Sequence, residues 1–264
     1  MLKIENVKKV FNAGTINEKV ALHDLNLTLN EGDFVTVIGG NGAGKSTMLN
    51  CVAGVFQPDE GKILIGDVDV THLPEYKRAK YIGRVFQDPM MGTAATMQIE
   101  ENMALALRRG KPRGLRIGIT KKERQLYKEQ LATLGLGLEN RLTAKVGLLS
   151  GGQRQALTLL MAALVKPKLL LLDEHTAALD PKTAAKVLEV TQQIVEKHHL
   201  TTMMITHNMR DAIAYGNRLI MMYDGHVVVD VSGEEKKNLT VEQLLKLFST
   251  ASGSDEADDK LLLG

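Results

Sequence analysis

The chain has 264 residues, of which 44% are hydrophobic and 24% are charged, a composition typical of a globular protein with a buried core. Its net charge of +2 gives no argument for a nucleic-acid partner, and its single cysteine cannot form a disulfide within the chain. The longest apolar runs fall far short of the ~18 residues that a membrane-spanning helix needs, and the N-terminus lacks the apolar core of a signal peptide. We therefore expect a cytosolic protein, for which any role at a membrane depends on partners.

The first thirty residues are predicted to form strands. Leu25, Leu27 and Leu29 alternate with polar residues, which is the period of a half-buried strand. After a turn, Phe34–Ile38 is a continuous apolar run typical of a strand that is buried on both faces. Further short strands are expected at 62–65 and at 85–87.

A glycine-rich loop separates this buried strand from a predicted helix. Its residues are Gly39, Gly40, Asn41, Gly42, Ala43, Gly44, Lys45, Ser46 and Thr47. The order of strand, loop and helix is the context in which backbone N–H groups close around the phosphates of a nucleoside triphosphate. We expect Lys45 to reach the phosphate oxygens, Ser46 to ligate Mg²⁺ and Thr47 to contact the α-phosphate.

From Asp88 to Gln153 the pattern changes from strand to helix. Residues 99–109 have helical spacing, and Thr120 and Glu123 form a capping-box pattern that opens a helix extending to Leu134. The sequence therefore predicts a helical subdomain at about 88–160, inserted into the core.

This subdomain contains a basic stretch between 108 and 124. We favour a solvated linker between two helices over a surface for anionic lipid headgroups or nucleic acid, since glycines and prolines interrupt the stretch. Its basic residues are Arg108, Arg109, Lys111, Arg113, Arg116, Lys121, Lys122 and Arg124.

A second loop suited to phosphate follows at Leu149-Ser150-Gly151-Gly152-Gln153. Ser150 offers a side-chain oxygen, the glycines leave backbone N–H groups uncovered, and an apolar stretch follows at once. These features predict the N-terminus of a helix, where unpaired N–H groups and the macrodipole favour an anion. Because one nucleotide does not need two such loops from one chain, the pair of loops indicates a dimer.

The character of a parallel sheet returns after this helix. Leu169–Leu172 is predicted to be a buried strand that ends at Asp173 and Glu174, at the edge where open α/β sheets bind ligands. Asp173 would hold Mg²⁺ through water, and Glu174 would polarise the attacking water. Without a phosphate loop in the same chain, a core strand ending in solvated acids would explain these residues equally well.

The remaining elements are predicted from local signals. Asp180 and the following proline are expected to start a helix, as N-cap and first helical residue. Strands are expected at 202–206 and 218–223, a hairpin turn at Asp224-Gly225, a strand at 227–229 and a last helix at 240–248.

The two loops and the strand ending at Asp173-Glu174 occur in the order found in the ATP-binding subunits of ABC transporters, which the sequence resembles from about Leu2 to Leu247. The resemblance implies an α/β fold, with a RecA-like P-loop core around a mostly parallel sheet, an N-terminal antiparallel β portion and the inserted α-helical subdomain. The ATPase domain would span residues 1–250. The tail at 251–264 is rich in small and acidic residues, which predicts disorder.

The resemblance also implies roles for residues that have simpler explanations when taken alone. Gln87 matches the Q-loop glutamine that touches Mg²⁺, although glutamine before Asp-Pro is commonly a turn residue. His207 matches the switch histidine that contacts the γ-phosphate, and Asp180 belongs to the D-loop, which crosses the dimer interface. Phe11 occupies the position of the ring that stacks on adenine, with a core residue as the alternative. Proline usually stands at His175 in the family, and we assign this histidine no catalytic role.

The mechanism that the resemblance implies is ATP-driven dimerisation. The phosphate loop of one subunit and Ser150–Gln153 of a second copy enclose ATP and Mg²⁺, and Lys45, Glu174 and His207 are the catalytic residues. The implied partners are that second copy, transmembrane permease subunits at the cytoplasmic face of the membrane and a solute-binding protein, with no nucleic acid. The sequence after Glu174 resembles importers of amino-acid-like solutes. The alternative is a non-transport ABC ATPase with soluble partners, of the cluster-assembly type.

Overall fold

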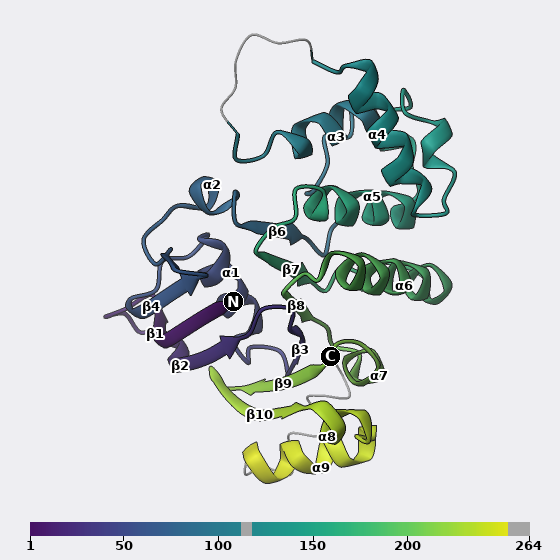
Figure 1. The fold of residues 1–264 in the computed structure, drawn as a ribbon. Helices are drawn as coiled ribbons and strands as arrows, with labels where there is room; N and C mark the ends of the chain where they lie inside the picture. Colours follow the sequence, from purple (N-terminus) through teal and green to yellow (C-terminus); the bar gives the residue numbers. More distant parts are fainter. Residues whose placement is uncertain (112–117, 253–264) are drawn as a thin grey trace. The chain divides into compact units, whose positions relative to one another are not determined.

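The computed structural model of the chain describes residues 1–111 and 118–252, which divide into two compact units (Figure 1). Unit 1 comprises Met1–Arg78 and the described residues from Leu200 onward, and unit 2 comprises the described residues of Ala79–His199. Arg113 and Arg116 of the predicted basic stretch lie outside the described residues, as does the predicted tail from residue 253 onward.

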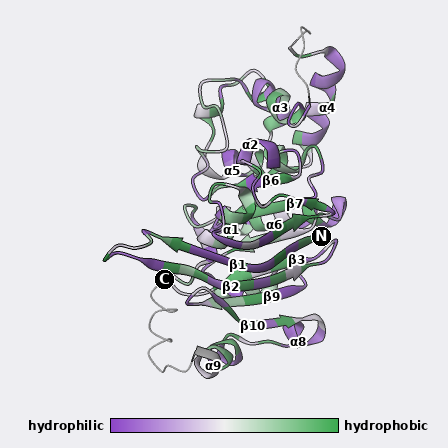
Figure 2. Cartoon of the chain, turned by 90° about the vertical axis from the view of Figure 1, so that its left-hand side faces the viewer, coloured by the Kyte–Doolittle hydropathy of each residue, from purple (hydrophilic) through white to green (hydrophobic). Residues whose placement is uncertain are grey.

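Unit 1 contains an antiparallel sheet with the strand order β2-β1-β4-β5. Its strands are β1 (Leu2–Phe11), β2 (Lys19–Leu29), β4 (Glu60–Ile65) and β5 (Val68–Asp69). Hydrophobic and polar residues are mixed along β1 and β2, which Figure 2 shows as green and purple segments of these strands. Leu25, Leu27 and Leu29 are buried and the polar residues between them are exposed, as their spacing predicts. The prediction of an N-terminal antiparallel β portion is therefore confirmed.

In the second group of strands in unit 1, β3 lies between β8 and β9. Strands β8 and β9 both run parallel to β3, and β10 is antiparallel to β9. Their bounds are β3 (Phe34–Ile38), β8 (Thr202–Ile205), β9 (Arg218–Tyr223) and β10 (His226–Ser232). Every residue of β3 and β8 is buried, because both faces of these strands are covered. The predicted hairpin turn at Asp224-Gly225 joins β9 to β10, as expected.

Helix α1 (Lys45–Ala53) is closed at its C-terminal end by a side chain from α2 (Glu75–Arg78). Arg78 is fully buried, and its guanidinium donates hydrogen bonds to the carbonyls of Cys51 at 2.6 Å, Val52 at 2.8 Å and Thr71 at 3.0 Å. The last carbonyls of a helix have no partner within the helix. Arg78 supplies these partners and places its positive charge at the negative end of the helix dipole.

Replacing Arg78 by methionine should lower the free energy of unfolding by roughly 3 kcal/mol, because buried carbonyls lose their donor. Urea unfolding of the Arg78→Met and parent proteins measures this difference. The control is Lys77→Met, which changes the exposed neighbouring residue. An Arg78→Met midpoint equal to that of the parent would show that water replaces the guanidinium without cost.

The C-terminal helices of unit 1 pack against β3 and β10. They are α7 (Met209–Ala214), α8 (Gly233–Lys237) and α9 (Val241–Ser252). Leu244 and Phe248 of α9 are buried in one cluster with Ile38, the last residue of β3. The strand that leads into the phosphate loop is therefore supported by the last described helix of the chain.

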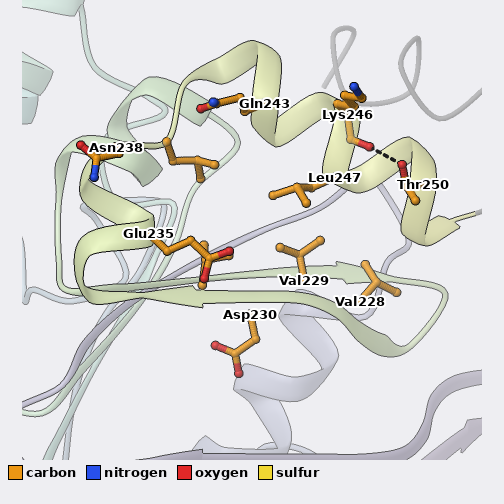
Figure 3. Close-up of a pocket in the computed structure, with 11 residues that line it drawn as sticks. Val228, Val229, Asp230, Glu235, Asn238, Gln243, Lys246, Leu247 and Thr250 are labelled. Atoms are coloured by element: carbon orange, nitrogen blue, oxygen red, sulfur yellow. Dashed lines mark hydrogen bonds between the residues drawn. The ribbon is translucent and has the colours of Figure 1, made fainter.

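A cavity of about 740 Å³ lies between β10, α8 and α9 (Figure 3). Val229, Leu239 and Leu247 contribute to its apolar lining, while Glu235 and Lys246 are among its charged residues. None of the predicted site residues lines it, so the cavity is distinct from the candidate nucleotide site.

Unit 2 contains the parallel strands β6 (Ile82–Val85) and β7 (Leu169–Asp173). The predicted strand at 85–87 is wrong in its bounds, because β6 ends at Val85 and Gln87 follows it. Pairing with β7 fixes these bounds, and it extends through Gly83, which no apolar pattern marks. Glycine is required there, since a Cβ at Gly83 would lie 2.5 Å from the carbonyl oxygen of Ala162.

The remaining elements in the described part of unit 2 are helical. The helices are α3 (Ile99–Leu107), α4 (Lys121–Ala132), α5 (Gly151–Ala163) and α6 (Pro181–His198), with short 3₁₀ turns at Leu138–Asn140 and Val146–Leu148. The predicted capping box forms at Thr120, which starts α4, and Figure 2 shows this helix mostly in the hydrophilic colour. Among residues 1–111 and 118–252, no helix combines the length and apolar character needed to cross a membrane.

Candidate nucleotide-binding and hydrolysis site

The phosphate loop connects β3 to α1 in unit 1, and two of its glycines are held against neighbouring backbone. Gly39 has a φ of 148° and Gly44 a φ of 98°. A Cβ at Gly39 would lie 2.2 Å from the carbonyl oxygen of Met222, and one at Gly44 would lie 2.7 Å from that of Ala21. Both positions therefore need glycine, for conformation and for space.

Lys45 is the first residue of α1, and its side chain turns back onto the loop. It is 6% exposed, and its ammonium donates to the carbonyls of Gly39 at 2.6 Å and Gly40 at 3.1 Å. Ser46 is exposed and Thr47 half-buried in the same first turn. The loop thus combines a cation, two hydroxyl groups and the N-terminus of a helix, an arrangement that favours a phosphate.

Phe11 and His207 belong to the same unit as the phosphate loop. Phe11, at the end of β1, is half-buried and makes an edge-to-face contact with Phe56, with ring centroids 5.3 Å apart. This contact gives Phe11 a packing role, while adenine stacking stays a prediction. His207 follows β8 and precedes Asn208, the N-cap of α7.

In unit 2, Ser150 is the N-cap of α5, as the sequence predicts. Its hydroxyl accepts from the backbone N–H of Gln153 at 3.3 Å, and the Gln153 side chain accepts from the N–H of Ser150 at 3.2 Å. A Cβ at Gly152 would lie 2.1 Å from a methyl carbon of Thr183. The glycine is therefore needed where the start of α5 meets the start of α6.

Two buried polar residues of α5, which sequence reasoning missed, hold the surrounding segments. Arg154 donates to the carbonyls of Val146 at 3.3 Å and Gly147 at 3.1 Å, just before the Ser150 loop. Gln155 donates to the carbonyl of Phe86 at 3.0 Å, directly before the exposed Gln87. The sequence feature that could have indicated these contacts is the pair of long polar side chains at the start of an otherwise apolar helix.

Asp173 is the last residue of β7 and lies beside Arg84 of β6. Their nearest nitrogen and oxygen atoms are 3.4 Å apart, and both side chains are mostly buried. Glu174 follows with a φ of 45°, in the left-handed region that non-glycine residues seldom adopt. Such strain is tolerated where the surrounding structure fixes it, and it is common at active sites.

His175 is fully buried and ties the segment after Glu174 to α6. Its Nε2 lies 3.0 Å from the hydroxyl of Thr191, which itself donates to the carbonyl of Val187 at 2.8 Å. The hydroxyl proton is therefore committed to Val187, so Nε2 carries the proton that it donates to the Thr191 oxygen. Burial lowers the pKa of His175 from 6.5 to about 4. The histidine at this position thus has a structural role.

Acid should destabilise the protein through His175. The unfolded histidine takes up a proton near pH 6.5, whereas the folded one resists protonation down to about 4, so stability is lost as the pH falls through this window. Between pH 6.5 and pH 5 this group should remove about 1.5 kcal/mol of unfolding free energy. Urea unfolding at both pH values measures the loss.

The matched variant is His175→Gln, which keeps a donor for Thr191 and cannot titrate in this range. It should show a smaller loss of stability between the two pH values than the parent. The exposed His72, changed to glutamine, serves as the control. If His175→Gln loses as much stability as the parent, the pH dependence comes from other groups.

Asp180 is the N-cap of α6, and Pro181 is the first residue of that helix, as predicted. The Asp180 carboxylate accepts from the backbone N–H of Thr183 at 3.1 Å, and hydrogen bonding to Thr183 lowers the pKa of Asp180. The exposed aspartate is thus fixed by its own helix.

The predicted site residues fall into two groups, each described within its own unit. Unit 1 holds Phe11, the phosphate loop from Gly39 to Thr47 and His207, while unit 2 holds Gln87, Ser150–Gln153, Asp173, Glu174 and Asp180. A buried parallel strand followed by a constrained glycine loop and a helix defines a P-loop nucleotide-binding protein.

The chain belongs to the ABC transporter family, whose model matches residues 22–177. It is 45% identical to the tyrosine transport ATP-binding protein of Clostridioides difficile (strain R20291), over 95% of this chain and all of that protein. It is 34% identical to the methionine import ATP-binding protein MetN of Streptococcus pneumoniae (strain ATCC BAA-255 / R6), over 91% of this chain and 68% of that protein.

Solved structures support the same assignment. The fold resembles that of a dimeric ATP-binding cassette in a post-hydrolysis state bound to ADP and Pi, with a TM-score of 0.74 and 32% identity over 88% of this chain and 98% of that one. The RecA-like P-loop fold predicted from the sequence is therefore confirmed. The chain is an ATP-binding subunit of an ABC transporter and hydrolyses ATP. Cassettes of this family dimerise and form parts of transporter complexes.

Proposed function

We propose that the chain powers the import of an amino-acid-like solute. The observation that carries this proposal is the 45% identity, over 95% of the chain, to a tyrosine transport ATP-binding protein. Methionine import proteins are among its other relatives. The cluster-assembly alternative has no such support, since these relatives are named for transport.

In the proposed mechanism, two copies of the chain enclose ATP. Lys45 and the loop amides bind the phosphates, and Ser150–Gln153 of the second copy completes the site with the N-terminus of α5. Glu174 accepts a hydrogen bond from the attacking water and orients it, and His207 contacts the γ-phosphate. Catalysis then depends on positioning and on electrostatic stabilisation of the charge that develops on the phosphate.

The residues also fit a magnesium ion. Among the described residues, no group of three His, Cys, Asp or Glu side chains could hold a metal. Mg²⁺ at nucleotide sites needs only one or two protein oxygens besides the phosphates and water. We propose that Ser46 and Gln87 supply these oxygens and that Asp173 holds the ion through water; bound Mg²⁺ would neutralise phosphate charge.

The proposed partners are transmembrane permease subunits, which would place the chain at the cytoplasmic face of the membrane, and a solute-binding protein. Affinity purification of the tagged chain from detergent-solubilised membranes tests this. We expect a polytopic membrane protein in stoichiometric amount. An exclusively soluble complex would contradict transport.

The solute class is tested by uptake. Deleting the gene should abolish uptake of labelled tyrosine or a related amino acid, and the parent chain should restore it while Lys45→Ala should not. Unchanged uptake of every amino acid tried would overturn the proposed substrate class while leaving the ATPase assignment intact.

A further inference from the structure

Lys19 lies at the phosphate loop, although no sequence motif marks it. It is the first residue of β2 and stands directly opposite Phe11 in the register of the β1–β2 ladder. Residues directly opposite in an antiparallel pair project from the same face of the sheet. Lys19 and the candidate adenine-stacking ring therefore share one face.

The ammonium of Lys19 reaches the middle of the loop. A Cβ built on Gly42 would lie 3.5 Å from Lys19 Nζ. Gly42 is exposed, with a φ of 82°, whereas Lys45 is buried and bonded to the carbonyls of Gly39 and Gly40. The loop thus has one cation on its buried side and a second on its solvent side.

The ammonium of Lys19 has no carboxylate partner among the described residues, because the acidic side chains nearby have other partners. Lys8 pairs with Glu60 and Lys9 with Asp59, both at 3.0 Å. The neighbouring carboxylate, Glu18, accepts from the backbone N–H of Gly14 at 2.6 Å. Lys19 forms no ion pair or hydrogen bond with any residue in the described part of the chain. An exposed ammonium that lies beside phosphate-binding amides and has no partner in that part of the chain can bind the anion of a ligand.

We propose that Lys19 is a further nucleotide-binding residue, whose ammonium donates to a phosphate oxygen of the bound nucleoside di- or triphosphate from the solvent side of the loop. The inference rests on the proposed binding of nucleotide at this loop. An ammonium carries three donors and no acceptor, so it suits a phosphate oxygen. We assign Lys19 a role in nucleotide binding and none in hydrolysis, because Lys45, Glu174 and His207 are the residues assigned to the chemical step.

The test is ADP binding by titration calorimetry at low and high salt. Lys19→Met should weaken binding by about fivefold at low salt, the upper range for an exposed ion pair, with a smaller effect at high salt. Lys19→Arg should keep the affinity within about twofold because it retains the charge. Melting temperatures should match the parent, since the ammonium stabilises no other residue.

The matched control is Lys3→Met, which removes a lysine of β1 that stands opposite Thr28, about 27 Å from Phe11 along the strand. Parental ADP affinity in Lys19→Met, or an equal loss in Lys3→Met, overturns the role of Lys19. Lys45→Ala is measured beside them and should abolish binding. Parental ADP affinity in Lys45→Ala would count against the nucleotide site itself. If Lys45→Ala loses ADP binding while Lys19→Met keeps the parental affinity, only the role of Lys19 is overturned.

Discussion

Glu174→Gln is expected to slow ATP hydrolysis by about 10²- to 10⁴-fold while ATP binding persists. The amide has the shape of the carboxylate and fits the same left-handed backbone, but it lacks the negative charge that polarises water. Nucleotide binding depends on the phosphate loop, which the substitution leaves intact. The variant should therefore accumulate as an ATP-bound dimer.

Two measurements check this expectation: phosphate release under steady-state conditions, and gel filtration with and without ATP. The control is Glu189→Gln, on the exposed face of α6, where the glutamate pairs with Lys186 at 2.9 Å. It should keep the parental rate and stay monomeric after hydrolysis. Hydrolysis by Glu174→Gln near the parental rate would remove Glu174 as the group that activates water.

The features that sequence reasoning predicts correctly depend on neighbouring residues. The buried strands at Phe34–Ile38 and Leu169–Leu172 are apolar runs, and their burial follows from composition alone. The helix starts at Ser150 and Asp180 are fixed by caps that bond three residues ahead. Local chemistry of this kind can be read from one sequence.

The features that it misses depend on residues far apart in the chain. Arg78 donates to the last carbonyls of α1, which belong to residues 26 and 27 positions earlier, so no local sequence pattern predicts this contact. Pairing with β7 sets the end of β6, and Gln155 bonds to Phe86, 69 positions away. Lys19 lies near Gly42 of the phosphate loop, 23 positions later in the chain, and opposite Phe11 through the pairing of β2 with β1.

The backbone of Glu174 is a third kind of feature. Glutamate has no preference for a positive φ, so the sequence predicts an ordinary conformation there. The structure instead turns the chain sharply after β7, with the N–H of Ala177 donating to the carbonyl of Glu174 at 3.0 Å. The burial of His175 behind it holds this turn, so the residue that departs from the family pattern supports the position of the candidate catalytic group.

Mixing Lys45→Ala with Ser150→Arg should restore ATP hydrolysis that neither variant shows alone. In a head-to-tail dimer each site takes the phosphate loop of one copy and the Ser150 loop of the other. Lys45→Ala removes the buried cation, and Ser150→Arg places a bulky side chain at the N-terminus of α5. A mixed dimer nevertheless keeps one intact site, built from the Lys45 of one variant and the Ser150 of the other.

Random exchange makes half of the dimers mixed, so the expected activity is about a quarter of the parental value. Ser150→Arg also loses the helix cap, at a cost of about 1 kcal/mol, and its melting temperature must show that it is folded. The control mixture combines Lys45→Ala with a double variant that carries both Lys45→Ala and Ser150→Arg. No dimer in this mixture has an intact site, so it should stay inactive. If the first mixture is no more active than its components, each site is complete within one chain, and the loop at Ser150 then serves its own subunit rather than a partner.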